Sequence, residues 1–286
     1  MPSTYAHYRL GQDVLARLSG ESAEVIKRYK QLYDIGLHGP DILFYYKPLV
    51  SCPVNRQGYA THDRSGRVFF EHAAQVIKGM DAEKKEAALA YVYGFCCHFA
   101  LDVSCHGYID EKIKASGISH TEIEVEFDRS LMLKDGYPPL THCLTSHIHP
   151  TYENAGIIQY FYENLTTDEI VKALEGMKRY NRLLTAPSHF KRYLIYALLW
   201  ITGNYKEMHG LLVNYKANPA CSDSTERLYQ LYDRAVGLAV GMIEEFGAYV
   251  EKTRPFRDIY NYTFGGKYVK PENEEKGGED HENASY

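Results

Sequence analysis

The sequence lacks the features that mark several common classes of protein. Its six cysteines include no Cys-x-x-Cys pair, which indicates neither a disulfide framework nor a thiolate zinc site, so we expect reduced cysteines in the core. Basic residues do not dominate either, because 32 Lys and Arg stand against 37 Asp and Glu, and the formal charge is -5. That balance provides no basic stripe for nucleic-acid phosphates, and we expect no stable nucleic-acid binding.

Signals for export and for membrane insertion are missing as well. The first residues, MPSTYAHYRLGQDV, contain no charged segment followed by an apolar one. No later stretch approaches the roughly 20 apolar residues that a membrane span needs. The sequence therefore predicts a soluble, cytoplasmic protein without a transmembrane segment, and it does not indicate an oligomeric state.

Helical patterns follow one another along the chain. At 286 residues one large domain can bury a sizeable core, and the sequence shows no internal repeat and no sustained strand pattern. We predict an all-α fold, a single-domain helical bundle over residues 1–268. The polar, acidic and Gly-rich segment PENEEKGGEDHENAS predicts a disordered tail over residues 269–286.

Apolar residues at spacings of three and four place the individual helices. The apolar run Tyr193–Ile201 predicts a buried helix, in which Trp200 belongs to the core. Residues 47–66 are expected to be irregular. The other expected helices cover Tyr5–Leu18, Ser22 to about Asp34, Ile42–Tyr46, Val68–Lys78, a long helix from the cap Asp81 to Ser116, His120 to about Lys134, Thr166 or Thr167 to about Leu184, and Ser222 or Ser224 to about Thr253.

The long helix contains polar side chains in an otherwise apolar pattern. His98, Asp102 and His106 recur every four residues, so on a helix they form one row on one face. A buried helix does not normally place two imidazoles and a carboxylate in the core unless a partner satisfies them. A metal ion is the economical partner.

A second helix repeats this spacing. His120 and Glu124 lie four residues apart and again share one helical face. Together with the first row they offer imidazole nitrogen and carboxylate oxygen without thiolate. That mixture of donors is typical of catalytic rather than structural zinc sites.

Three residues nearer the N-terminus are further candidates. His7, in the first turn of the first helix, is either a surface imidazole or a ligand. Asp41 is either the N-terminal cap of the helix that follows it, or a ligand or general base. His62 is the only histidine of the irregular segment, the kind of segment in which sites are commonly built.

The candidates outnumber the ligands of a single ion. One zinc ion uses three or four protein ligands, so two or three ions are the natural stoichiometry, and Asp102 is placed to offer one oxygen to each of two ions. A separate cluster of His142, His147 and His149 lacks carboxylates and a helical register, and we interpret it as a polar surface loop. The eight candidate ligands are His7, Asp41, His62, His98, Asp102, His106, His120 and Glu124.

These pieces resemble the zinc-dependent phospholipase C family of bacteria, all-helical enzymes that share a fold and a trinuclear zinc site with the S1/P1-type nucleases. The matching features lie within residues 1 to about 130. They are an N-terminal His, an Asp in a Gly-Pro-Asp turn, a Thr-His-Asp loop, the His-Asp-His run and the His-x3-Glu pair. The resemblance implies a metal site between the helices of the bundle.

The same resemblance implies which residues hold which ion. His7 with a bridging Asp102 would hold a third ion, and because the chain has no Trp where secreted members use one, water or the amine of Pro2 would complete it. The other two ligand sets are Asp41, His62, His98 and Asp102 for the first ion, and His106, His120 and Glu124 for the second.

The expected activity follows from clustered metal ions. Such ions activate water and neutralise charge on a phosphoryl group, so a phosphodiester, in particular a phospholipid, is the fitting substrate, with Asp41 as general base. A nuclease or nucleotidase of the S1/P1 type and a non-catalytic helical protein braced by its metals are the alternatives. Aromatic residues that could line an approach for diacylglycerol are Tyr5, Tyr8, Phe44, Tyr45 and Tyr59.

Overall fold

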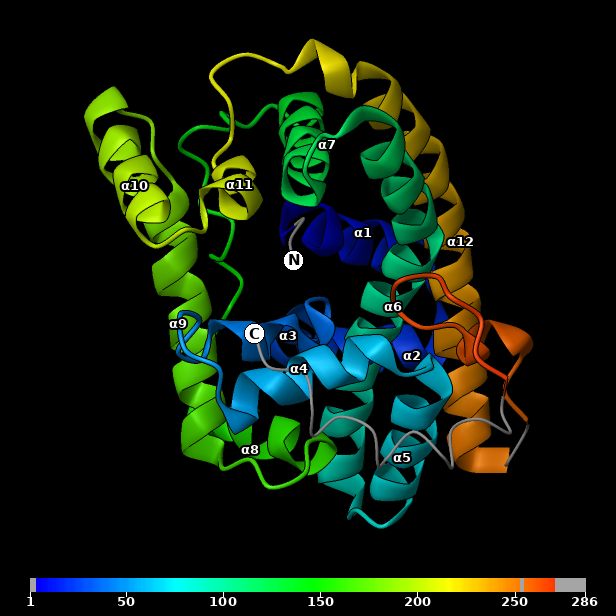
Figure 1. Cartoon of the computed structure of the whole chain (residues 1–286). Coiled ribbons are helices and arrows are strands. Elements are labelled where there is room, and N and C mark those ends of the chain that lie inside the picture. Colours follow the sequence, from blue (N-terminus) through cyan, green and yellow to red (C-terminus); the bar gives the residue numbers. More distant parts are fainter. Residues whose placement is uncertain (1–3, 253–254, 271–286) are drawn as a thin grey trace.

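The computed structural model describes residues 4–252 and 255–270, and nearly all of its regular structure is helical (Figure 1). Over these residues there are two isolated β-bridges and no strand. The predicted all-α architecture is therefore confirmed. Residues 271–286 of the predicted tail lie outside the described residues, as does Pro2, whose amine is the alternative to water at the predicted third zinc ion.

Twelve α-helices and several short 3-10 helices make up the described chain. The α-helices are α1 (Thr4–Arg17), α2 (Gly20–Arg28), α3 (Lys30–Gly36), α4 (Pro53–Asp63), α5 (Gly66–Lys78), α6 (Ala82–Ser116), α7 (His120–Lys134), α8 (Tyr152–Ile158), α9 (Thr167–Leu184), α10 (His189–Ile201), α11 (Tyr205–Met208) and α12 (Ser222–Lys252). The 3-10 helices are η1 (Gly39–Tyr45), η2 (Gln159–Phe161), η3 (His209–Leu211), η4 (Pro219–Cys221) and η5 (Asp258–Asn261).

The longest helix, α6, runs through the core, where α3 and α12 pack against it. Asp81 caps it by accepting a hydrogen bond from the backbone N–H of Lys84 at 3.0 Å, and Gly117 ends it with a φ of 71°. Both ends agree with the prediction. Among the described helices, α6 alone is long and apolar enough to cross a membrane, although the sequence analysis expected no such stretch. Most of this stretch is buried inside the protein, as in the core helix of a globular protein.

Two glycines allow α3 and α6 to approach closely. A Cβ on Gly36 would lie 2.1 Å from the carbonyl oxygen of Tyr91, and a Cβ on Gly94 would lie 2.2 Å from that of Tyr33. Both distances are far inside van der Waals contact, so only glycine fits at either position. The close crossing brings the segment after α3, which contains Asp41, against the polar row of α6.

The first segments of the chain differ from the prediction in two places. The second helix begins at Gly20, before the predicted cap Ser22, and Tyr29 divides it into α2 and α3 because its φ of -112° and ψ of 43° are not helical. Residues 47–66 are not irregular throughout, because α4 begins there. Its start has recognisable signals, with Pro53 in the first turn and a capping box formed by Cys52 and Asn55.

The prediction of a buried helix at residues 193–201 is wrong. A helix does form there as α10, but it lies at the edge of the molecule (Figure 1) and leaves most of its large apolar side chains exposed. The physical reason is a shortage of neighbours, because α10 packs only on a small cluster. That cluster consists of the buried residues Ala186, Ile195, Leu199 and Leu212, separate from the main core.

All six cysteines are free, as predicted. Cys143 is exposed, so the expectation that all of them lie in the core fails for this one. The others are buried or half-buried, and none takes part in the clusters of metal-ligand type described next.

Candidate metal centre

The structure brings all eight predicted ligand residues into one region of the molecule. Three groups of side chains have donor atoms within 4.8 Å of one another, and together they contain every predicted ligand. Five elements supply them. The residues are His7 from α1, Asp41 from η1, His62 from α4, His98, Asp102 and His106 from α6, and His120 and Glu124 from α7.

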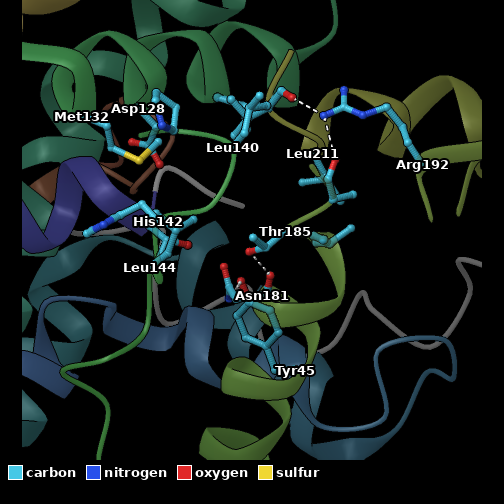
Figure 2. A pocket seen from close by; sticks show the side chains of 16 residues that line it. Tyr45, Asp128, Met132, Leu140, His142, Leu144, Asn181, Thr185, Arg192 and Leu211 are labelled. Carbon is cyan, nitrogen blue, oxygen red and sulfur yellow. Dashed lines mark hydrogen bonds between the residues drawn. The ribbon is translucent and has the colours of Figure 1, made fainter. Parts of the chain in front are cut away.

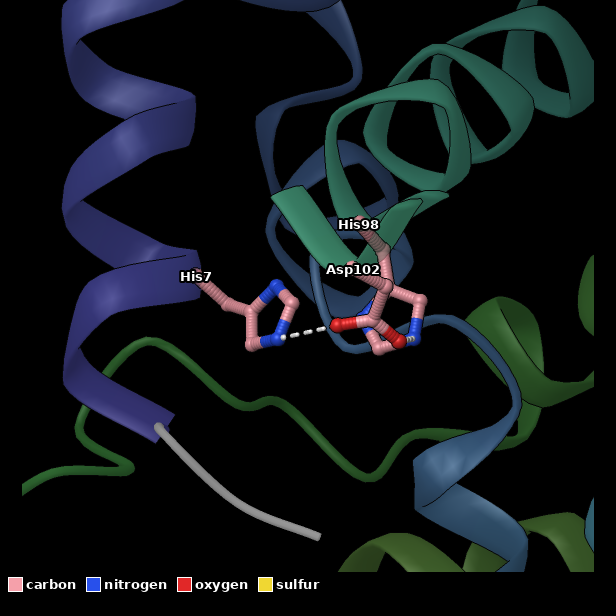
Figure 3. Close-up of side chains that lie close together, drawn as sticks. All are labelled: His7, His98 and Asp102. Carbon is pink, nitrogen blue, oxygen red and sulfur yellow. Dashed lines mark ion pairs between the residues drawn. The ribbon is translucent and has the colours of Figure 1, made fainter. Parts of the chain in front are cut away.

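Asp102 lies at the centre of this region, with its two carboxylate oxygens facing different histidines. Oδ1 is 3.3 Å from His7 Nε2 and 3.8 Å from His106 Nε2. Oδ2 is 3.2 Å from His98 Nε2 and 3.7 Å from His62 Nε2. Figure 3 shows the carboxylate between His7 and His98, whose rings are stacked with centroids 4.4 Å apart.

A second group lies where α6 meets the start of α7. Glu124 Oε1 is 3.0 Å from His120 Nε2 and 3.3 Å from His106 Nε2. Ser119 starts α7 by accepting a hydrogen bond from the backbone N–H of Glu122, so His120 and Glu124 occupy the first two turns. His106 faces both groups and links them.

Asp41 is held next to His98 by the backbone of η1. Gly39 has a φ of +48°, and a Cβ there would lie 2.3 Å from the His98 ring, so glycine is needed for the turn and for the space. The interpretation of Asp41 as a helix cap is wrong, because it lies inside η1 and its Oδ1 is 3.0 Å from His62 Nε2.

Backbone carbonyl groups orient two of the histidines. His62 Nδ1 lies 3.0 Å from the carbonyl oxygen of Gly58, and His106 Nδ1 lies 2.9 Å from that of Phe264. When Nδ1 donates a hydrogen bond to a carbonyl, the proton of the neutral ring is on Nδ1. The lone pair is then on Nε2, which faces the carboxylates and can bind a metal ion. In its neutral form, each ring is therefore the tautomer that can bind metal through Nε2.

The start of α1 is fixed by a residue that the sequence reading did not select. Asp128 is buried on α7 and accepts hydrogen bonds from the backbone N–H groups of Tyr5 and Ala6 at 2.9 and 2.8 Å. Burial raises the pKa of Asp128 to about 7, although the two N–H groups act in the opposite direction. These bonds position the first turn of α1 and with it His7.

A turn near the C-terminal end of the described chain covers the site. Phe264 is fully buried and its ring centroid lies 4.9 Å from that of His62, while its carbonyl orients His106. Gly266, with a φ of +73°, allows the turn, after which Lys267 lines the pocket described below. The sequence reading missed these residues because they lie more than 150 positions from their partners, and only the Gly265-Gly266 pair marks a turn.

Opposite charges and burial compete in this cluster. Burial would raise the pKa of Asp102 and Glu124, but the adjacent histidines outweigh it and hold both pKa values well below the usual range. Burial would lower the pKa of His106, but Asp102 and Glu124 raise it to about 9. For His98 burial prevails, and its pKa is lowered. Metals bind ionised carboxylates and unprotonated ring nitrogens, so an ion here would have to displace the proton that the raised pKa keeps on His106.

The donor set fits zinc. Both ring nitrogens of His98 and Oε2 of Glu124 are buried and form no hydrogen bond, a costly state unless another group satisfies them. Nitrogen and oxygen donors without sulfur suit a catalytic zinc site, and the histidines with backbone partners have the support that metal ligands normally have.

All the predicted ligands except His98 line one pocket of about 340 Å³. Of the aromatic residues expected at the approach, Phe44 and Tyr59 line it, with ring centroids 4.3 Å apart. Tyr5 and Tyr8 do not, and Tyr45 lines a separate cavity of about 50 Å³ between α7, α9 and α10 (Figure 2). That smaller cavity contains none of the predicted ligands.

The histidines of the loop before α8 are not all at the surface. His147 is buried, and its Nε2 lies 2.7 Å from His38 Nε2, so the prediction of a polar surface loop is wrong for this residue. The reason is that Tyr8 stacks on the His147 ring at 4.0 Å and shields it. His142 is half-buried and His149 is exposed, and no group of metal-ligand type among the described residues includes any of the three.

Comparison with known proteins agrees with this geometry. The family model described as "Zinc dependent phospholipase C" matches residues 6–184, which span every predicted ligand. The turn that contains Phe264 and Lys267 lies beyond the match. No curated protein and no solved structure matches the chain.

Proposed function

Because the chain belongs to the zinc-dependent phospholipase C family, we propose that it hydrolyses the phosphodiester bond of a phospholipid with two to three zinc ions bound. One observation supports this most directly. The two oxygens of Asp102 face different sets of histidines, His62 and His98 on one side and His7 and His106 on the other. A carboxylate so placed can serve two ions at once.

We assign the ligand sets as the family resemblance implies, and the short distances within the cluster support the assignment. Asp102 would belong to the first set through Oδ2, which faces His62 and His98, and would hold the third ion with His7, which Oδ1 faces. The first set also contains Asp41, His62 and His98, and the second set contains His106, His120 and Glu124.

Bound zinc supplies the chemistry by polarising a phosphoryl oxygen and by lowering the pKa of water in the pocket. Asp41 faces that pocket as an ionised carboxylate, because His62 outweighs the effect of burial and lowers its pKa. It would accept the proton of the attacking water as the phosphorus–oxygen bond to the alcohol breaks, and solvent would protonate the leaving oxygen. The products are a phosphomonoester and the free alcohol.

The rest of the pocket binds and orients the substrate. Lys267 is exposed on the pocket wall, where its ammonium group attracts the phosphate. Phe44 and Tyr59 provide an apolar wall for the glycerol side. Asp63 and Asp110 also line the pocket, and their negative charge opposes the many phosphates of a polynucleotide, which disfavours the nuclease alternative.

Metal analysis and substrate comparison test the proposal together. Protein purified without a histidine tag is analysed by inductively coupled plasma mass spectrometry and assayed on phosphatidylcholine, bis-p-nitrophenyl phosphate and single-stranded DNA. We expect two to three zinc equivalents, hydrolysis of the first two substrates, and loss of activity with EDTA. Less than one equivalent with full activity after EDTA would refute the proposal, and faster turnover of DNA would assign the site to the nuclease class.

A cytoplasmic location stays a prediction of the sequence. Cell fractionation tests it, and recovery of most of the protein from the culture medium would contradict it.

A further inference from the structure

Among the described helices, α10 has the most exposed large apolar side chains, and the metal site does not explain them. Trp200, Ile201 and Phe190 are 76, 74 and 73% exposed. Phe190, Leu194 and Ile201 share one side of the helix, at spacings of four, seven and eleven residues, and Tyr193 and Trp200, seven apart, lie next to them. Trp200 is the only tryptophan of the chain. The full set of exposed large apolar residues on α10 is Phe190, Tyr193, Leu194, Leu198, Trp200 and Ile201.

The opposite face of α10 is anchored, so the exposed face cannot turn inward. The guanidinium group of Arg192 is buried and donates hydrogen bonds to the backbone carbonyls of Ala186 and Val213 (Figure 2). It also lies 4.3 Å from the centre of the Tyr215 ring. Turning the helix would break these bonds and expose Ile195 of the small cluster beneath.

The stretch of sequence that contains α10 carries charged residues of one sign. Residues 176–205 contain five Lys and Arg and no Asp or Glu, although the whole chain carries a formal charge of -5. Lys191 on α10 donates to the carbonyls of Arg182 and Thr185, so its charge stays beside the helix. Large apolar side chains next to basic residues are typical of helices that lie in the interface of an anionic membrane.

The position of α10 connects this face to the metal centre. After α10 the chain passes through α11 into η3, which packs against the start of α7. The contact is tight, because a Cβ on Gly210 would lie 2.7 Å from the backbone nitrogen of Glu122. Glu122 lies between His120 and Glu124, so α10 is attached to the segment that holds these two predicted ligands.

We propose that the exposed face of α10 docks the protein on an anionic phospholipid bilayer, with Trp200 and its apolar neighbours inserted between the head groups. Apolar burial supplies one part of the binding and attraction of the basic segment the other. The inference goes beyond hydrolysis, and because binding is measured without turnover it can fail or hold independently of the proposed activity.

The test uses the full chain with its metal and two kinds of vesicle. One is phosphatidylcholine alone, and the other contains about one third phosphatidylglycerol. Trp200 reports insertion by a shift of its emission to shorter wavelength, and flotation measures the bound fraction. We expect both signals with the anionic vesicles and much weaker signals with the neutral ones or at high salt.

Variants locate the binding surface. The double variant F190S/I201S keeps the reporter and should bind at least about tenfold more weakly, since each side chain loses its apolar burial. Tyr152→Ser is the matched control, because Tyr152 is 64% exposed but lies on α8, far from α10 in Figure 1. Melting curves verify that both variants are folded.

Several outcomes would overturn the docking proposal. Absence of flotation and of a wavelength shift would do so, as would equal loss of binding in the control. Self-association that F190S/I201S abolishes, seen by light scattering, would assign the face to a second copy instead. Hydrolysis of bis-p-nitrophenyl phosphate should be unchanged in F190S/I201S, so loss of docking and loss of the proposed activity are distinguishable.

Discussion

Two apolar helices, α6 and α10, have opposite positions in the molecule. In α6 every residue from Ala90 to Asp102 is buried, whereas α10 exposes most of its large side chains. The helices differ in what surrounds them rather than in their apolarity. Gly94 allows α3 to pack directly on α6, and α12 covers another side, whereas α10 contacts only a small separate cluster. An apolar helix is therefore buried only where other segments cover it.

The largest expected effect concerns the polar row of α6. Replacing Asp102 with Asn keeps the size of the side chain but removes the charge and one good donor oxygen, so the ions on both sides should weaken together. Activity should fall by more than about 100-fold, since loss of an outer partner alone costs about 10- to 100-fold. Zinc content and melting temperature should fall as well.

Glu124→Gln is the matched control, because Glu124 contacts only His106 and His120 among the predicted ligands. It should loosen a single ion. Both variants are compared by metal analysis and thermal melting side by side. If Asp102→Asn loses no more zinc than Glu124→Gln, Asp102 does not bridge two ions. The proposed linked sites would then have to be replaced by separate, independent metal sites.

A pair of phenylalanines compares the two helices directly. Phe95 on α6 is fully buried and stacks on Phe69 at 3.6 Å, so Phe95→Ala should cost about 3–5 kcal/mol in the free energy of unfolding. Phe190→Ala on α10 should change it by less than about 0.5 kcal/mol. Urea unfolding measures both. An equal cost at Phe190 would mean that another molecule covers α10 and that the contrast between the helices is wrong.

Local signals in the sequence were sufficient for much of α6 and α7. The cap Asp81, the break at Gly117 and the four-residue spacing of the ligands depend on residues close together in the chain, and the structure agrees with them. The exposure of α10 was missed because apolar spacing predicts a helix but not its neighbours. The role of Phe264 at His106 was missed because that contact joins residues 158 positions apart.

The close crossing of α3 and α6 can be tested within α6 alone. Gly94→Ala forces the new Cβ against a backbone oxygen, so the helices must separate, and the free energy of unfolding should fall by about 3 kcal/mol. Gly107 lies in the same helix with nothing within 4 Å of a Cβ, so Gly107→Ala should be neutral or slightly stabilising. Similar destabilisation by both variants in urea unfolding would contradict the crossing.

The smallest expected effect compares a buried histidine of the main core with an exposed one on α10. His147 Nε2 lies 2.7 Å from His38 Nε2, so one ring donates and the other accepts, and the accepting ring must be neutral. Burial lowers the pKa of His147 to about 3 and that of His38 well below its ordinary value. His189 on α10 is exposed, and its ring lies against Tyr215 rather than another histidine.

A histidine whose pKa is lower in the folded protein than in the unfolded chain stabilises the fold above about pH 6.5. That contribution is lost as the pH falls toward 3, because the unfolded chain binds a proton that the folded protein does not. Between about pH 6 and 5 the loss approaches 1.4 kcal/mol per pH unit. His147→Gln should lower the pH dependence of the unfolding free energy by about that amount, whereas His189→Gln should leave it unchanged. Urea unfolding across this pH range measures the slope of the unfolding free energy against pH for both variants. The same slope in the wild type and in His147→Gln would show that His147 is already protonated in the folded protein.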